Sequence, residues 1–306
     1  MHAWRERAGG WTALAEELVR RGGATAQMPD NLETIERGLR RLARRGDQPG
    51  GQYGRWVERF FGVPPELASW LRWLGQYHSR FADLPVSLRR RQLAHWDRPP
   101  FSEAAAGIWI DLSMASVGLR LDDAALRDTR LASARRKLGR ASVAAVLEHA
   151  LLSARIEDPG VRWLDEAQPH LDDPSLSPID ALCYRARYLD GRAYARMRDG
   201  GTFEEGRALY EAIDAHSGVP FVAFRRAMGL GYCAWKLGDP ETGERLALEA
   251  AEHAGDGGFV RLRSMALNLA SRVATGARSE AYAARAEAIG ARLEDEDLLI
   301  RVRKPR

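Results

Sequence analysis

Hydrophobic side chains recur every three or four residues along most of this chain, and short polar segments separate the recurring runs. This period is typical of helices that bury one face. Segments rich in Gly, Pro and Asp, such as Gly238-Asp239-Pro240, end one run before the next begins. The pattern therefore predicts an all-α fold. Beyond residue 100 the predicted helices are 102–119, 122–138, 141–156, 160–170, 178–198, 203–216, 219–237, 240–254, 259–274 and 278–293.

The predicted helices form consecutive pairs. Their first helices begin near residues 102, 141, 178, 219 and 259, a spacing of roughly forty residues that lies within the range of helical repeat proteins. Because one pair of helices cannot cover its own apolar face, neighbouring pairs have to stack. We therefore expect residues 101–300 to form an α-solenoid of about five antiparallel pairs.

One pair carries small residues and a turn at regular positions: Leu230-Gly231, Gly238-Asp239, Gly243, Ala247 and Ala250. This order and spacing resemble the tetratricopeptide consensus. Small residues are needed at these positions because they let the two helices approach closely. The preceding pair has a similar arrangement of Gly191, Tyr194, Phe203, Gly206 and Tyr210. The resemblance implies stacked helix pairs with a concave groove, lined by the first helix of each pair.

The resemblance also implies which side chains face the groove. Aligning Gly231 with the family's glycine places there Arg225, Met228, Tyr232, Trp235 and Lys236. Aligning Gly191 in the same way adds Arg185, Tyr188, Arg192 and Arg196. Cations beside aromatic rings bind carboxylates and apolar groups, so we expect a protein or peptide ligand that is acidic or has a free C-terminal carboxylate. In the alternative interpretation, these side chains form a solvated face or pack between repeats.

Residues 1–100 differ in composition from the rest. They hold 17 Arg and 11 acidic residues, a net charge of +6, whereas residues 101–306 hold 29 Lys or Arg and 31 acidic residues, a net charge of −2. We therefore expect a separate, basic and Trp-rich helical domain over residues 1–100. Its short helices resemble a helix-turn-helix domain, although no Ala-x-x-x-Gly turn is present. The predicted helices are 11–21, 31–45, 52–61, 65–81 and 85–96.

One helix of this domain is rich in arginine. Leu39 and Leu42 form its inner face, and the remaining surface is covered by Arg37, Arg40, Arg41, Arg44 and Arg45. Such a helix can neutralise DNA phosphates. Alternatively, it presents a solvated face on which glutamates one turn earlier pair with Arg37 and Arg40.

Other chemistry finds little support in the sequence. The two cysteines, Cys183 and Cys233, exclude a disulfide framework and favour a reducing, cytoplasmic location. The seven histidines lack metal-ligand spacing, and no nucleotide-binding or nucleophile motif occurs. There is neither a signal-peptide core nor an uncharged apolar run of about 18 residues. We therefore expect no metal, no cofactor, no membrane association and no enzymatic activity.

These observations lead to a functional hypothesis and two alternatives. The chain resembles the cytoplasmic bacterial regulators that join a helix-turn-helix to a tetratricopeptide sensor, which implies that a bound peptide changes how the protein contacts DNA. The first alternative is a pure protein-interaction scaffold that binds no nucleic acid. The second is an enzyme with an unrecognised site. The sequence leaves open a homodimer.

Overall fold

The computed structural model describes residues 1–23, 26–45, 51–157 and 160–303. Within these ranges every regular element is helical, which confirms the all-α prediction. The first half contains α1 (His2–Ala8), α2 (Trp11–Gly22), α3 (Leu32–Arg44), α4 (Gly51–Phe61), α5 (Pro65–Gly75), η2 (Arg80–Asp83), α6 (Val86–Trp96), η3 (Ala105–Gly107), α7 (Ile108–Arg120), α8 (Ala124–Lys137), η4 (Leu138–Arg140) and α9 (Val143–Ile156). The second half contains α10 (Val161–Ala167), η5 (Gln168–His170), α11 (Pro178–Arg198), α12 (Phe203–Glu211), α13 (Pro220–Lys236), α14 (Pro240–Asp256), α15 (Val260–Val273), α16 (Gly276–Leu293) and α17 (Glu296–Arg303).

Polar side chains fix where several helices begin. Asn31 accepts a hydrogen bond from the Glu33 amide at 2.8 Å at the start of α3, and Asp239 accepts one from the Thr242 amide at 3.0 Å at the start of α14. At α12, the Thr202 hydroxyl and the Glu205 carboxylate each accept a backbone N–H of the other residue. These bonds satisfy amides that have no partner within the helix.

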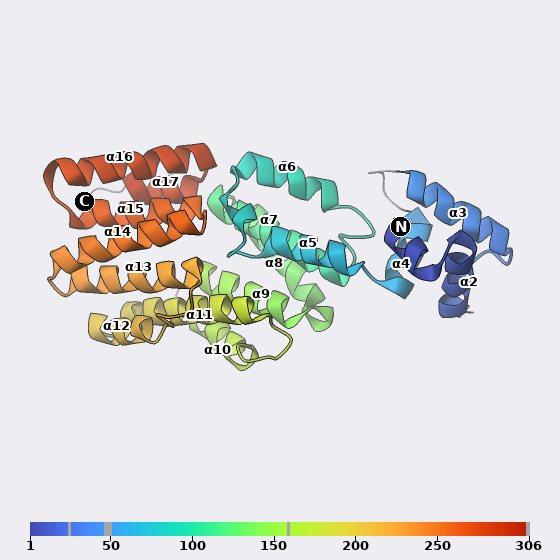
Figure 1. Cartoon of the computed structure of the whole chain (residues 1–306), viewed down its shortest axis with the longest axis horizontal. Helices are drawn as coiled ribbons and strands as arrows, with labels where there is room; N and C mark the ends of the chain where they lie inside the picture. The colour runs from blue at the N-terminus through green and yellow to red at the C-terminus, as the bar shows by residue number, and fades with distance from the viewer. Residues whose placement is uncertain (24–25, 46–50, 158–159, 304–306) are drawn as a thin grey trace.

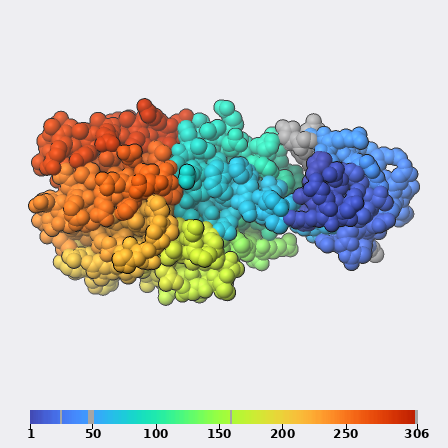
Figure 2. All heavy atoms as spheres, in the orientation of Figure 1, coloured from blue at the N-terminus to red at the C-terminus, as the bar shows by residue number. Residues whose placement is uncertain are grey.

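The helices follow one another along an elongated molecule (Figure 1). Helices α1–α4 lie at one end, α5–α8 occupy the middle, and α13–α17 lie at the other end; Figure 2 shows α1–α4 as a distinct lobe. The buried residues of this lobe, among them Leu14, Ile35 and Val57, form their own apolar cluster. Residues 65–96 pack instead against α7, in the cluster that contains Leu71 and Trp109. The division at residue 100 stays a prediction, but the apolar cores separate just after Phe61.

Glycines at matching positions let helices α13 and α14 pack closely. A Cβ atom added to Gly231 would lie 3.2 Å from the Gly243 carbonyl oxygen, and one added to Gly243 would lie 3.2 Å from the Gly231 carbonyl oxygen. Each glycine thus makes room for the backbone of the other helix. Gly238 takes the left-handed conformation (φ 89°) in the turn between them. The packing reason inferred from the sequence is confirmed for this pair.

The largest departure from the predicted helices follows α5. We predicted one helix over 65–81, but α5 ends at Gly75, and Gln76 is extended (ψ 133°). A Cβ atom at Gly75 would lie 2.7 Å from the Trp109 carbonyl oxygen, so α5 ends where it presses against α7. The chain then continues irregularly through Tyr77 and His78 to η2. Smaller differences are that α7 begins after a 3₁₀ turn, that α12 ends at Glu211, and that α1 and α17 were not predicted.

None of the helices in the described ranges has both the length and the apolar character needed to cross a membrane. The longest, α11, has 21 residues, but charged side chains recur along it, including Arg187 and Asp190. Most of its apolar residues face neighbouring helices, as shown by the burial of Tyr184 and Ala193, whereas Ile179 and Tyr194 are exposed. Packing within the protein therefore accounts for the apolar face of this helix.

Candidate functional site

A cavity of about 470 Å³ lies among α9, α11 and α13, with contributions from α15, α17 and the segment after α5. Residues spaced by three or four positions provide its walls, because one face of each helix is turned toward it. Helix α11 contributes Arg187, Asp190, Gly191, Tyr194 and Ala195. Helix α13 contributes Arg225, Met228, Gly229 and Tyr232. The remaining side chains that bear on its chemistry are Tyr77, Arg155, Glu157, Met197, Met265 and Arg301.

Two arginines of the cavity are held by carboxylates of neighbouring helices. The two terminal nitrogens of Arg187 donate to Glu148 on α9 at 2.6 and 2.9 Å, in a fork in which both side chains are buried. Arg225 on α13 donates to Asp190 on α11 at 2.7 Å. Asp190 also accepts a hydrogen bond from the Tyr210 hydroxyl at 3.1 Å. These pairs fix the direction of each guanidinium at the cavity wall.

Three more arginines meet carboxylates at the start of α17. Arg155 and Arg301 lie 3.3 and 2.9 Å from the Asp297 carboxylate. Arg261, on α15, donates to Asp295 at 2.6 Å and lies 3.1 Å from Asp297. The side chain of Asp295 is completely buried, and its pKa is lowered because the charges of Arg261 and Arg120 outweigh the effect of burial. Ion pairs therefore hold the start of helix α17 beside the cavity.

Tyr77 is the point at which these arginines converge. Its hydroxyl oxygen lies 3.4 Å from Nη1 of Arg155 and 3.3 Å from Nη1 of Arg261, both of which donate to it. The guanidinium carbons of Arg187 and Arg225 lie 5.0 and 5.3 Å from the centre of its ring. Burial alone would raise the pKa of Tyr77, but the charges of Arg225, Arg261 and Arg155 together lower it to about 7. A phenol in this environment is partly ionised near neutral pH.

The segment that carries Tyr77 is anchored on both sides of that residue. The Gln76 side-chain amide donates to Asp180 at 3.0 Å, and Nε2 of His78 lies 3.1 Å from the same carboxylate. Arg72 on α5 pairs with Asp180 as well. Burial, followed by the charge of Arg187, lowers the pKa of His78 well below its ordinary value, so the ring is neutral and its Nε2–H donates to Asp180. Asp180 therefore fixes the position of Tyr77 through its neighbours.

The cavity wall combines arginines with an apolar surface. Its lining holds four arginines and two carboxylates, namely Arg155, Arg187, Arg225 and Arg301 with Glu157 and Asp190. Two further carboxylates outside the lining, Glu148 and Asp297, pair with three of these arginines. The apolar part includes Met197, Met228, Met265 and the ring of Tyr232. Methionine side chains adapt to ligands of different shape. The arrangement suits an anionic group attached to an apolar side chain.

The groove residues expected from the sequence separate into two groups. Arg225 and Tyr232 line the cavity, together with Met228. The other six lie outside its lining, namely Arg185, Tyr188, Arg192, Arg196, Trp235 and Lys236. Their cations are already engaged, Arg185 with Asp172, Arg192 with Asp165 at 2.6 Å, and Arg196 with Glu205 at 2.6 Å. The Tyr188 hydroxyl donates to Gln168 at 3.0 Å, and Lys236 lies 4.1 Å from the Trp235 ring centre. These six side chains make intramolecular contacts, and peptide binding stays a prediction.

Sequence reasoning missed the most informative cavity residues. On α11 the alignment of Gly191 selected Arg185, whereas the cavity is lined by Arg187, two positions later and almost opposite on the helix. Gly191 itself packs on α10, since a Cβ atom there would lie 2.9 Å from Leu164, whereas Gly231 packs on the following helix. Tyr77 was predicted within a helix, and nothing in its local sequence marks the break.

The arginine-rich helix α3 lies in the lobe at the other end of the molecule. All five of its candidate arginines are exposed: Arg37, Arg40, Arg41, Arg44 and Arg45. Arg37 pairs with Glu33 at 2.7 Å and Arg40 with Glu36 at 2.6 Å, one helical turn apart. Exposed pairs of this kind contribute little to stability. DNA contact by this surface stays a prediction.

Metal and thiol chemistry receive no support from the described residues. Nowhere within residues 1–23, 26–45, 51–157 and 160–303 do three or more His, Cys, Asp or Glu side chains gather closely enough to hold a metal ion. Burial raises the pKa of Cys183 to about 12 and that of Cys233 to about 11. Both groups therefore stay protonated and poorly nucleophilic at neutral pH.

No family model matches this chain, and no match was found among the curated proteins or the solved structures. The function therefore has to be argued from the side chains themselves. Among those described, the strongest concentration of buried charge surrounds Tyr77 in the cavity between α9, α11 and α13. Perturbed ionisable groups in a cavity mark a functional site more often than an ordinary surface does.

Proposed function

We propose that this chain is a peptide-binding protein that holds an acidic segment or a C-terminal carboxylate in the cavity around Tyr77. In this proposal the consecutive helix pairs form a tetratricopeptide-like solenoid, and the cavity is part of its concave face. The observation that carries the proposal is the convergence of four arginines on one cavity beside an apolar wall. A guanidinium group has five N–H donors, more than a single carboxylate partner accepts, so an anionic ligand can accept donors that remain.

The positions of the cavity arginines support a carboxylate ligand in particular. Arg187 is oriented by buried Glu148 and Arg225 by half-buried Asp190, so little conformational entropy is lost when they meet a ligand. The side chains of Arg155 and Arg301 retain 27% and 47% of their exposure, so a ligand can reach them. The methionines beside them would cover the apolar part of the terminal residue. Charge would thus select the terminus and the apolar wall would select its side chain.

In its full form, the proposal is a peptide-sensing regulator. The lobe formed by α1–α4 has its own apolar core, and five exposed arginines lie on or directly after α3. A lobe of this kind would present α3 to DNA, and ligand binding would alter the position of the lobe. The alternative is a scaffold that binds a protein partner without nucleic acid. An enzyme would instead use the Tyr77 phenolate as a base, but two arginines already donate to its oxygen.

A peptide-binding measurement tests the central claim. We expect fluorescently labelled acidic peptides with a free C-terminus to bind more tightly than the same peptides with a C-terminal amide. The Arg155→Gln variant should lower the affinity about tenfold, because one charge-assisted hydrogen bond is lost. Arg185→Gln is the matched control, since Arg185 lies on α11 outside the cavity and pairs with Asp172. Equal affinities for the acid and amide peptides, or equal losses in the two variants, would contradict the proposal.

A further inference from the structure

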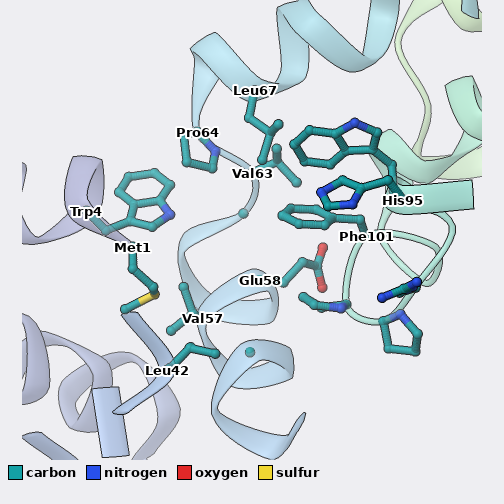
Figure 3. Close-up of a pocket in the computed structure, with 16 residues that line it drawn as sticks. Met1, Trp4, Leu42, Val57, Glu58, Val63, Pro64, Leu67, His95 and Phe101 are labelled. Carbon is teal, nitrogen blue, oxygen red and sulfur yellow. The ribbon is translucent and has the colours of Figure 1, made fainter. Parts of the chain in front are cut away.

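A second pocket, of about 270 Å³, lies where the α1–α4 lobe meets the rest of the molecule. Figure 3 shows its walls: α1 and α4 form one side, and α5, α6 and the segment after α6 form the other. Leu67, Val57 and Phe101 make much of the lining apolar. This pocket is distinct from the cavity around Tyr77, because the two share no lining residue.

Two aromatic rings form a corner on one side of the pocket. The ring centres of Trp96 and Phe101 lie 5.6 Å apart, and their planes meet at 64°. Both residues line the pocket. Aromatic faces carry partial negative charge and attract organic cations, most strongly when two or more rings surround the same space. The corner therefore favours a positively charged, poorly hydrated group.

A single glutamate lies beside this corner. The carboxylate of Glu58 points toward the Phe101 ring (Figure 3) and is only partly exposed. Among the residues that the structure describes, none pairs with it or donates a hydrogen bond to it. Burial raises the pKa of Glu58, as does the nearby charge of Glu103, while Arg140 opposes them. A cation bound in the corner would supply the missing charge partner.

The opposite wall carries an unsatisfied donor. The indole N–H of Trp4 is buried and finds no acceptor among the described residues. Arg7 covers one face of this ring, with its guanidinium carbon 4.9 Å from the ring centre, so the ring itself is held in place. A buried donor without an acceptor is costly. Because protein atoms cover this N–H, the Trp4 side of the pocket contributes apolar surface to it.

We propose that this pocket binds a small organic cation, such as a quaternary ammonium alcohol. The cationic group would occupy the corner of Trp96 and Phe101 beside Glu58. Arg98 and His95 also line the pocket, but both are exposed, so water screens the charge of Arg98. Glu58 is the charged side chain that the apolar walls enclose.

A pair of isosteric probes tests the charge requirement. Choline and 3,3-dimethylbutan-1-ol have the same shape and the same hydroxyl group, but only choline is charged. Titration calorimetry with the full chain should show choline binding at least tenfold more tightly than the neutral alcohol. Two results would overturn the proposal: no choline binding at millimolar concentration, or equal binding of the two probes.

Variants then identify the residues. Glu58→Gln keeps the shape of the side chain and should weaken choline binding about tenfold. Glu16→Gln, on the exposed face of α2, is the matched control and should leave the affinity unchanged. Thermal unfolding shows whether each variant is folded. Unchanged choline affinity in folded Glu58→Gln would contradict the assignment of the pocket.

Discussion

Arginine has opposite roles at the two ends of this molecule. In the α1–α4 lobe, Arg37 and Arg40 are exposed and pair with glutamates one turn away on the same helix. Around Tyr77, Arg187 and Arg261 are buried and pair with carboxylates from distant helices. The first arrangement depends on local sequence alone, whereas the second exists only after the helices have packed. The number of arginines in a segment therefore says less about function than their partners do.

The largest expected effect comes from breaking a buried pair. Glu148→Gln leaves the Arg187 guanidinium without a charge partner in a buried position. We expect the free energy of unfolding to fall by about 3–5 kcal/mol, measured by urea denaturation. The corresponding change in the lobe, Glu33→Gln, removes the partner of exposed Arg37 and should produce no measurable change. Similar losses of unfolding free energy in the two variants would show that the buried and the exposed ion pairs do not differ in their contribution to stability.

A change in glycine packing should have the next largest effect. A Cβ atom at Gly229 would lie 2.1 Å from the Tyr210 ring, which packs against α13 at the edge of the cavity. Gly229→Ala should therefore destabilise the protein by about 1–3 kcal/mol. Gly255→Ala, in α14, is the control because its added Cβ would meet no atom within 4 Å. The urea midpoints of the two variants should differ clearly, with that of Gly255→Ala unchanged or slightly raised.

Tyr77 gives the cavity a pH dependence of its own. Its pKa is about 7 in the folded chain and near 10 when unfolded. Because the folded pKa is the lower one, ionisation stabilises the folded state increasingly as pH rises from about 7 toward 10. The difference in unfolding free energy between the unmodified protein and Tyr77→Phe should therefore grow over this range. A difference that stays constant with pH would show that the arginines do not hold a phenolate.

The smallest effect on stability is expected in α3. Arg41→Gln combined with Arg44→Gln should leave the urea midpoint unchanged, because both side chains are exposed. If α3 contacts DNA, the same variant should bind mixed DNA a few-fold more weakly at low salt and show a shallower salt dependence. Arg90→Gln combined with Arg91→Gln, on α6, is the charge-matched control. Absence of DNA binding by the unmodified protein would remove the DNA part of the proposed function.

The sequence predicted what local periodicity determines. Helices α11 and α13 lie almost where their apolar pattern placed them, and the Gly231–Gly243 approach followed from small residues at matching positions. The helix break after Gly75 could not be predicted, because its cause is Trp109, more than thirty residues away. The side of α11 that faces the cavity was also misjudged, since Gly191 contacts a different neighbour from Gly231. Local pattern specifies an element, and tertiary contact decides which of its faces is used.

The partners of the acidic residues at the start of α17 could not be predicted from the sequence either. In the sequence, Asp295 and Asp297 fit carboxylates at a helix start or in a tail. In the structure they neutralise Arg261 and Arg155 beside the cavity. Their partners lie 34 and 142 positions earlier in the chain. No sequence periodicity relates residues at such separations.

The short helix α5 reaches both pockets. Leu67, near its beginning, lines the pocket beside the lobe, and the chain that leaves its end carries Tyr77 into the cavity between α9, α11 and α13. Because the helix is continuous over its 11 residues, a ligand that displaced one end would also move the other end. Thermodynamic linkage then sets a strict condition: whatever factor choline imposes on peptide affinity, the peptide must impose on choline affinity. Helix α5 would thus couple the binding of two ligands that do not contact each other.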